Sequence, residues 1–129
     1  MSLAKNLLLL IVSSVLVAVC LSEDKKLVVG ERQLGDKLER SETVSEEYNI
    51  FGKKVIVEKW FNVTTPGHVI TQVIATNQVT DGTGAEVTLY GGGPNNPGVK
   101  LRFKSQRWHG VYYKVEIYGQ SASYSAIYT

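Results

Sequence analysis

The sequence has little of the chemistry that most enzymes and metal-binding proteins use. Its 129 residues include one cysteine and two histidines, and no HExxH, paired-cysteine or G-x-S-x-G spacing accompanies them. The glycine-rich stretches lack the Gly-Lys-Ser/Thr ending and the following helix of a phosphate-binding loop. We therefore expect a protein that is not an enzyme and holds no metal or cofactor, with both histidines as polar surface residues.

Long apolar runs are also missing, except at the amino terminus. There, an apolar run over residues 7–21 follows Lys5 and ends before Glu23. This arrangement is typical of a secretory signal peptide, because a membrane anchor usually needs about 20 apolar residues. Cleavage of residues 1–22 also removes Cys20, so the exported chain has no disulfide. We expect a secreted, extracellular protein free of the membrane; an uncleaved anchor and a lipoprotein lipidated on Cys20 are the alternatives.

A strong net charge is absent as well. Cleavage removes one of the 14 basic side chains and none of the 12 acidic ones, so the exported chain is close to neutral. Several cations nevertheless gather between residues 100 and 107. If four of them contacted phosphates, the salt slope would be about −3.6, and binding would weaken roughly a hundredfold between 50 and 200 mM salt. We therefore expect no direct binding of nucleic acid, and an unidentified protein or an anionic glycan as the partner.

Helical periodicity is missing, whereas alternation of apolar and polar residues recurs along the chain. Residues 54–64 and 68–78 are separated by a turn and predict one hairpin. Residues 99–105 and 111–118 predict a second hairpin, with Phe103 beside Tyr113. About six to eight short strands of this kind predict an all-β fold, a single small antiparallel β-sandwich or barrel-like domain.

The clearest alternation places Lys100, Arg102 and Lys104 on the outer face of the second predicted hairpin. In that register Lys100 lies opposite Glu116 and Lys104 opposite Tyr112. A register shifted by two residues instead pairs Arg102 with Glu116. The cations therefore have neighbours within the sheet, and a solvated outer face explains the pattern without a partner. A binding surface is the alternative.

The candidate interaction surface extends this stripe into the tip of the predicted hairpin. Trp108 lies at the tip, where it either folds back over the edge of the sheet, as we expect, or faces a partner. The surface consists of Lys100, Arg102, Lys104, Arg107 and Trp108.

The amino-terminal part of the exported chain is polar. We expect residues 23–48 to form a leader segment with a turn at Gly35-Asp36 followed by extended chain, or else a short helix. Residues 49–129 are expected to form the β domain. Asn62 begins an N-x-T pattern for N-linked glycosylation, so its side chain is expected to face solvent and to carry a glycan.

Several short segments in the second half of the chain follow the pattern of a known family. They are ITQVIATNQ over residues 70–78, a glycine-rich loop, LRFKSQR with its Ser-Gln-Arg ending, and VEIYG over residues 115–119. Over about residues 66–119 they resemble the MBF2 family of small arthropod proteins, described as salivary or haemolymph secreted peptides; residues 94–97 and Trp108 depart from its pattern. The resemblance implies a small secreted, non-enzymatic β-domain protein that acts as a binding module. The family name implies an alternative, a transcription coactivator that bridges other factors without binding DNA directly, and the signal peptide argues against it.

Overall fold

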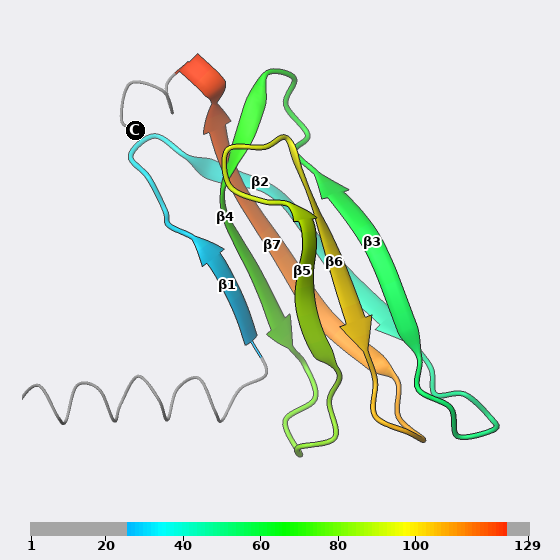
Figure 1. Cartoon of the computed structure of the whole chain (residues 1–129). Helices are drawn as coiled ribbons and strands as arrows, with labels where there is room; N and C mark the ends of the chain where they lie inside the picture. The colour runs from blue at the N-terminus through cyan, green and yellow to red at the C-terminus, as the bar shows by residue number, and fades with distance from the viewer. Residues whose placement is uncertain (1–25, 124–129) are drawn as a thin grey trace, which may run out of the picture.

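The computed structural model describes residues 26–123, and the predicted signal peptide lies outside them. This part of the chain forms seven β-strands (Figure 1). Within it, no helix has the length and apolar character of a membrane span. The strands are β1 (Lys26–Gly30), β2 (Lys37–Glu46), β3 (Ile56–Asn62), β4 (His68–Asn77), β5 (Glu86–Gly92), β6 (Gly98–Lys104) and β7 (Val111–Ser121).

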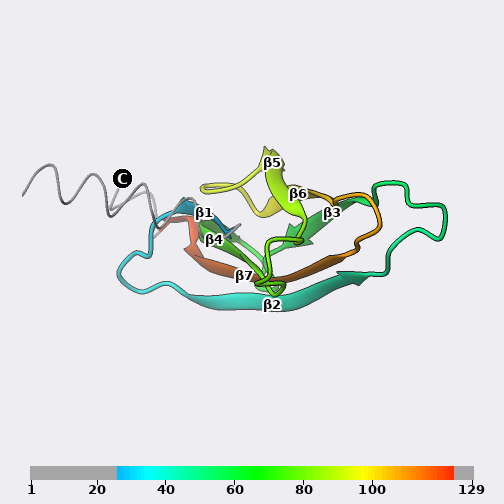
Figure 2. The same cartoon turned by 90° about the horizontal axis from the view of Figure 1, so that it is seen from below.

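The strands form two antiparallel sheets that pack face to face (Figure 2). One sheet has four strands in the order β1-β4-β7-β2, and we call it sheet A. The other has three strands in the order β3-β6-β5, and we call it sheet B. Neither sheet closes on itself within the described residues, so the prediction of an antiparallel sandwich is confirmed and the barrel-like form is not adopted.

Both predicted hairpins are wrong, because in each case the chain crosses from one sheet to the other. β3 pairs with β6, whereas β4 pairs with β1 and β7. β6 pairs with β3 and β5, whereas β7 pairs with β2 and β4. The apolar face of a strand is buried by the opposite sheet whichever strands lie beside it. Alternation of apolar residues therefore does not specify which strands pair. Phe103 and Tyr113 do meet, but across the core, with ring centroids 5.1 Å apart.

The core lies between the inward faces of the two sheets. The apolar alternation predicted the inward side chains correctly. Each large apolar side chain contributes roughly 1.5–3 kcal/mol when fully buried. Tyr113 also donates its hydroxyl hydrogen to the carbonyl of Ala85 at 2.5 Å, and burial raises the pKa of this hydroxyl. The largest fully buried side chains are Tyr113, Phe61, Phe103, Ile70, Leu101, Ile117, Val73, Val99 and Val115.

The described part of the segment expected as a polar leader, residues 23–48, supplies two strands of sheet A. β1 pairs with β4, and β2 pairs with β7 at the opposite edge. The chain does turn at Gly35-Asp36 and then run extended, and no short helix forms there. β2 has no apolar stripe in the sequence because two of its part-buried positions hold Arg40 and Glu42.

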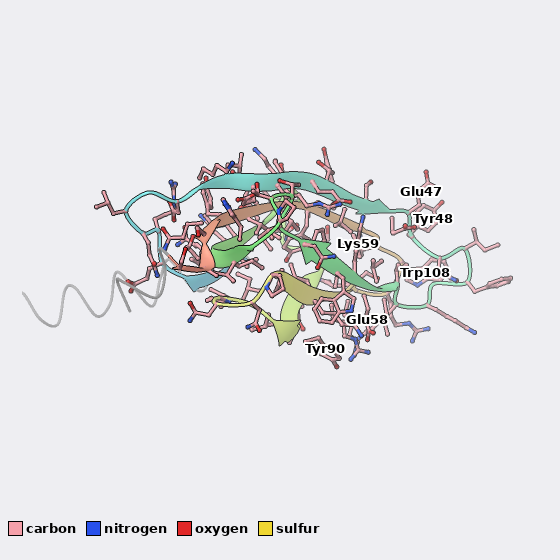
Figure 3. The ribbon with its side chains drawn as sticks, turned by 90° about the horizontal axis from the view of Figure 1, so that it is seen from above. Glu47, Tyr48, Glu58, Lys59, Tyr90 and Trp108 are labelled. Atoms are coloured by element: carbon pink, nitrogen blue, oxygen red, sulfur yellow. The ribbon has the colours of Figure 1, made fainter. Side chains whose placement is uncertain are left out.

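Those two residues belong to an ion-pair cluster that joins the sheets at one open edge. Glu42 accepts hydrogen bonds from Arg40 at 2.9 Å and from Lys59 of β3. Figure 3 shows Lys59 between the two sheets. The hydrogen bond from Lys59 lowers the pKa of Glu42 against a smaller opposing effect of burial. Charges on edge strands discourage pairing with another chain.

A second polar cluster lies at the end of the sandwich where β4 begins. Glu39 sits at a bulge in β2, and its buried carboxylate accepts hydrogen bonds from Thr64 and Thr65 at 3.0 Å each. It also accepts one from Nδ1 of His68 at 2.5 Å. Burial raises the pKa of Glu39, but the hydrogen bonds, led by that from His68, bring it below its ordinary value. His68 is therefore partly exposed, with 21% of its side chain accessible, and is held by Glu39.

Candidate interaction surface

Three connections between strands lie together at one end of the sandwich, which we call the loop end (Figure 1). They are residues 47–55, 78–85 and 105–110. The predicted surface residues divide between this end and the outer face of sheet B, because β6 runs along that face and ends at the loop end. Lys100 and Arg102 lie beside Glu58, Lys104 and Arg107 line one hollow, and Trp108 packs on Gly52.

The outer face of sheet B carries the first part of the basic stripe, with neighbours other than those predicted. The carboxylate of Glu58 in β3 lies 3.4 Å from Nζ of Lys100 and 3.6 Å from Nε of Arg102. The predicted cross-strand partners Glu116 and Tyr112 belong to sheet A, so that assignment is wrong. Exposed ion pairs contribute about 0–1 kcal/mol each. Their main effect here is to offset one of the two positive charges in this half of the stripe.

Two aromatic side chains cover the same part of sheet B. The hydroxyl of Tyr90 accepts a hydrogen bond from Arg102, whose guanidinium lies 5.1 Å from the Tyr90 ring centre. Trp60 reaches across β6, and a Cβ added at Gly91 of β5 would lie 3.4 Å from its Cη2 atom. Figure 3 shows Tyr90 and Glu58 on the outer side of this sheet. The sequence prediction missed both aromatics, although Trp60 stands in the clear alternation of residues 54–64.

The second part of the stripe makes no ion pair within 4 Å among the described residues. Lys104 and Arg107 line a hollow of about 360 Å³ together with Lys54, which we call the basic hollow. Among the described residues, no carboxylate lies within 4 Å of the charged nitrogens of these three side chains. Lys54 was missed by the sequence prediction because it lies far from the stripe in the chain.

The Ser-Gln-Arg segment of the family resemblance fastens the loop end together. The Ser105 hydroxyl accepts a hydrogen bond from the backbone N–H of Val55 at 2.6 Å. The Gln106 amide donates to the carbonyl of Gly82 at 2.9 Å. The Arg107 guanidinium donates through Nε to the carbonyl of Gly52 at 3.3 Å. Three successive residues therefore link β6 to the two neighbouring connections.

Trp108 folds back, but onto a loop rather than over the edge of a sheet. Its indole covers Gly52, where an added Cβ would lie 2.2 Å from Cε2. The ring remains 57% exposed, so it is packed on one side and available on the other. Its φ of 67° is in the left-handed region, which is uncommon for a bulky residue. Such conformations tend to accompany functional sites.

Large apolar side chains gather next to Trp108. Ile50 is 74% exposed and Phe51 72%, and Tyr48 is exposed as well. Their loop is ordered by hydrogen bonds from the N–H of Phe51 to the Asn49 side chain at 2.8 Å and from the N–H of Gly52 to the Asn49 carbonyl at 2.9 Å. Figure 3 shows Tyr48 and Trp108 at the same end of the molecule. We call Tyr48, Ile50, Phe51 and Trp108 the apolar tip. The signal in the sequence was Ile50-Phe51 between two turn residues.

A second hollow of about 400 Å³ lies at the loop end. Its walls include Glu46, Glu47, His109 and Tyr48 of the apolar tip. Within residues 26–123, no group of three or more His, Cys, Asp and Glu side chains is arranged to hold a metal ion.

Asn62 is exposed at the last position of β3. The strand begins near the loop end and runs away from it, so Asn62 lies at the far end of sheet B. The hydroxyl of Thr64, the third residue of the N-x-T pattern, donates to the backbone carbonyl of Glu39 at 3.0 Å. A glycan on Asn62 would leave the loop end uncovered.

The fold and the loop end define a small antiparallel β-sandwich that displays an ordered surface on its loops. The chain belongs to the MBF2 family, which is described as "Transcription activator MBF2" and matches residues 29–119. The match includes the last two residues of β1 and all of β2, so the family resemblance reaches further toward the amino terminus than the expected start at residue 66.

The chain is also similar to a protein from Bombus ignitus named "Probable salivary secreted peptide". The two are 38% identical over 99 residues, which cover 77% of this chain and 72% of the relative. This similarity and the family match support the resemblance stated from the sequence.

Proposed function

We propose that this chain is a small secreted protein that binds an extracellular protein partner through the apolar tip. The name of the Bombus ignitus relative and the signal-peptide pattern of residues 1–22 support secretion. We also propose that the protein has no catalytic activity and no cofactor.

The exposure of the apolar tip is the observation that carries the proposal. Ile50 and Phe51 are adjacent, and each exposes more than two thirds of its surface. Scattered exposed apolar residues are ordinary, but contiguous ones on a soluble protein mark interaction sites. Tryptophan and tyrosine dominate the binding energy of protein interfaces, and the tip holds one of each.

The order of the tip favours binding over accidental exposure. Asn49 closes the turn that presents Ile50 and Phe51, and Trp108 packs on Gly52 beneath it. A loop whose backbone is already held in place loses little conformational entropy when a partner covers it. A rigid apolar loop is therefore an efficient contact surface.

The matched variants Phe51→Ser and Leu34→Ser test this proposal. Both side chains are similarly exposed, 72% and 73%, but Leu34 lies in the turn between β1 and β2, away from the loop end. Wild type and the two variants are immobilised at equal density on a solid support. Each support is exposed to extracellular fluid from the source animal, and the proteins retained on it are quantified. We expect one partner to be retained by wild type and Leu34→Ser and at least about tenfold less by Phe51→Ser. Equal retention by all three would exclude the tip as the binding site.

A second function, transcription activation, is favoured by the family description. The family resemblance stated from the sequence implies that such activation would proceed by bridging other factors. The location of the full chain in insect cells separates the two functions. Protein in the medium whose amino terminus starts near residue 23 supports the secreted binding protein. Nuclear protein that retains Lys5 and Cys20 supports the coactivator.

A further inference from the structure

The basic hollow differs from the rest of the basic stripe in its charge balance. Lys100 and Arg102 share Glu58, which lies within 4 Å of both. Glu86 is the carboxylate among the residues lining the basic hollow, and it lies opposite Lys104 in the register of β5 and β6. None of the three cations has its charged nitrogen within 4 Å of this carboxylate. The hollow therefore keeps a surplus of about two positive charges, at pH 7, in a protein that is otherwise close to neutral.

The three cations come from three separate segments that hydrogen bonds hold together. Lys54 precedes β3, Lys104 ends β6 and Arg107 follows in the next loop. Reciprocal bonds between Ser105 and Val55, with the N–H of Ser105 donating to the Val55 carbonyl at 2.8 Å, keep the first two segments side by side. Holding like charges together is unfavourable, and Glu86 offsets one of the three. The positive charge that remains favours the approach of an anion.

Arg107 is presented in a way that suits an oxyanion. Its Nε donates to the carbonyl of Gly52, which fixes the guanidinium plane. The two terminal nitrogens have no carboxylate partner within 4 Å among the described residues. A planar guanidinium binds two oxygens of a sulfate or carboxylate group side by side, and two neighbouring lysines add charge without demanding one geometry.

The size and surroundings of the hollow fit a group carried on a larger chain. Its volume of about 360 Å³ far exceeds the roughly 30 Å³ that one water occupies in the liquid. The outer face of sheet B continues from it along β6 toward Tyr90 and Trp60, and both rings are about half exposed. Exposed rings offer flat apolar surfaces beside polar groups, which suits the C–H faces of sugars.

We infer that the basic hollow is a binding site for the sulfate groups of an acidic polysaccharide, which extends from it over the outer face of sheet B. This inference rests on the proposed function, because acidic polysaccharides are polymeric anions of the extracellular space in which the protein is proposed to act. The apolar tip is a different surface, so the two sites are tested separately.

Heparin serves as the probe of this site. The protein is purified from insect cells expressing the full chain, and its affinity for heparin is measured by calorimetry across a series of NaCl concentrations. Lys54→Gln/Lys104→Gln is compared with Lys37→Gln/Lys114→Gln, which removes the same charge from exposed positions of sheet A. We expect the first pair to lose about tenfold or more in affinity and to lower the salt slope by about two, and the control pair to stay close to wild type.

Several results would overturn the inference. They are failure of wild type to bind heparin, equal losses in both pairs of variants, equal binding of desulfated heparin, and equal competition by single-stranded DNA or by inorganic sulfate at the same sulfate concentration. Phe51→Ser is included as a reference and is expected to bind heparin like wild type. If wild type captures the protein partner but does not bind heparin, this inference fails and the proposed function is unaffected. If wild type binds heparin but captures no protein partner, the proposed function fails and this site is unaffected.

Discussion

At the scale of single residues, Glu39 shows how one buried charge organises a connection between strands. Its carboxylate has no exposed surface and accepts hydrogen bonds from Thr64, Thr65 and His68. These donors lie at the start of β4 and in the turn before it, so the carboxylate ties β2 to that turn. An ionised acceptor makes each of these bonds stronger than a neutral one would be.

The variant Glu39→Gln tests the charge of this group. The pKa of Glu39 lies below its ordinary value of 4.5, so the unfolded chain binds the proton more readily than the folded chain. This contribution to stability is fully present above about pH 5 and is lost as pH falls through the lowered pKa. We expect Glu39→Gln to be about 1.5–3 kcal/mol less stable at pH 7 and to show a shallower loss at acid pH.

Urea unfolding at pH 7 and at successively lower pH measures both effects. Glu47→Gln, an exposed carboxylate outside the strands, is the control and is expected to behave like wild type. If Glu39→Gln unfolded with the same acid dependence as wild type, the ionised state of Glu39 would have no role in stability.

At the scale of the elements, the two loops that form the apolar tip depend on one another. Gly52 has a φ of +73° and is buried beneath Trp108. Arg107, one residue before Trp108, donates to the Gly52 carbonyl. The position therefore needs glycine for two reasons, the backbone conformation and the space that the indole occupies.

Gly52→Ala and Gly67→Ala separate these two reasons. Gly67 has a similar φ of +78°, but an added Cβ there meets nothing within 4 Å. Both variants pay about 1–2 kcal/mol for the left-handed backbone, and Gly52→Ala in addition displaces Trp108. We expect a larger fall in Tm for Gly52→Ala, and a red shift of Trp108 fluorescence in a Trp60→Phe background. Equal Tm values and unchanged fluorescence would show that the ring does not rest on Gly52.

At the scale of the whole molecule, the sandwich keeps the two candidate sites and the glycosylation pattern at opposite ends. The apolar tip and the basic hollow share the loop end, while Asn62 lies at the far end of sheet B. Asn62 begins the single N-x-S/T pattern in the sequence. A glycan at that end adds a bulky polar group without covering either candidate site.

We predict that the secreted protein carries one N-linked glycan, on Asn62. Glycosidase treatment is expected to lower the mass of wild type and to leave Asn62→Gln unchanged. Because of the separation of the ends, Asn62→Gln is expected to keep its partner and heparin binding. Wild type of unmodified mass in the medium of insect cells would contradict the glycosylation, and altered binding in Asn62→Gln would contradict the separation.

Much of the fold was predictable from the sequence. The apolar faces of residues 55–63, 99–103 and 111–117 point into the core as predicted. β2 was missed because its inward side holds Arg40 and Glu42, whose partner Lys59 lies in another sheet. Polar residues that are paired at long range look like solvated ones in a sequence.

The candidate surface was predictable in part. The stripe and Trp108 were recognised, but Lys54, Ile50 and Phe51 were not. These residues belong to a loop that lies at the surface because β2 and β3 belong to different sheets. The spacing of residues along the chain does not show to which sheet a strand belongs.

The sequence by itself determined the composition of each strand face, because burial of alternate side chains follows from the geometry of a single strand. Only the tertiary structure decided which strands pair and which loops meet, because an apolar face is equally well buried by several partners. That decision set Lys100 and Arg102 beside Glu58 and left Lys104 with Lys54 and Arg107. One stripe in the sequence thereby became a face whose charge is partly offset and a basic hollow.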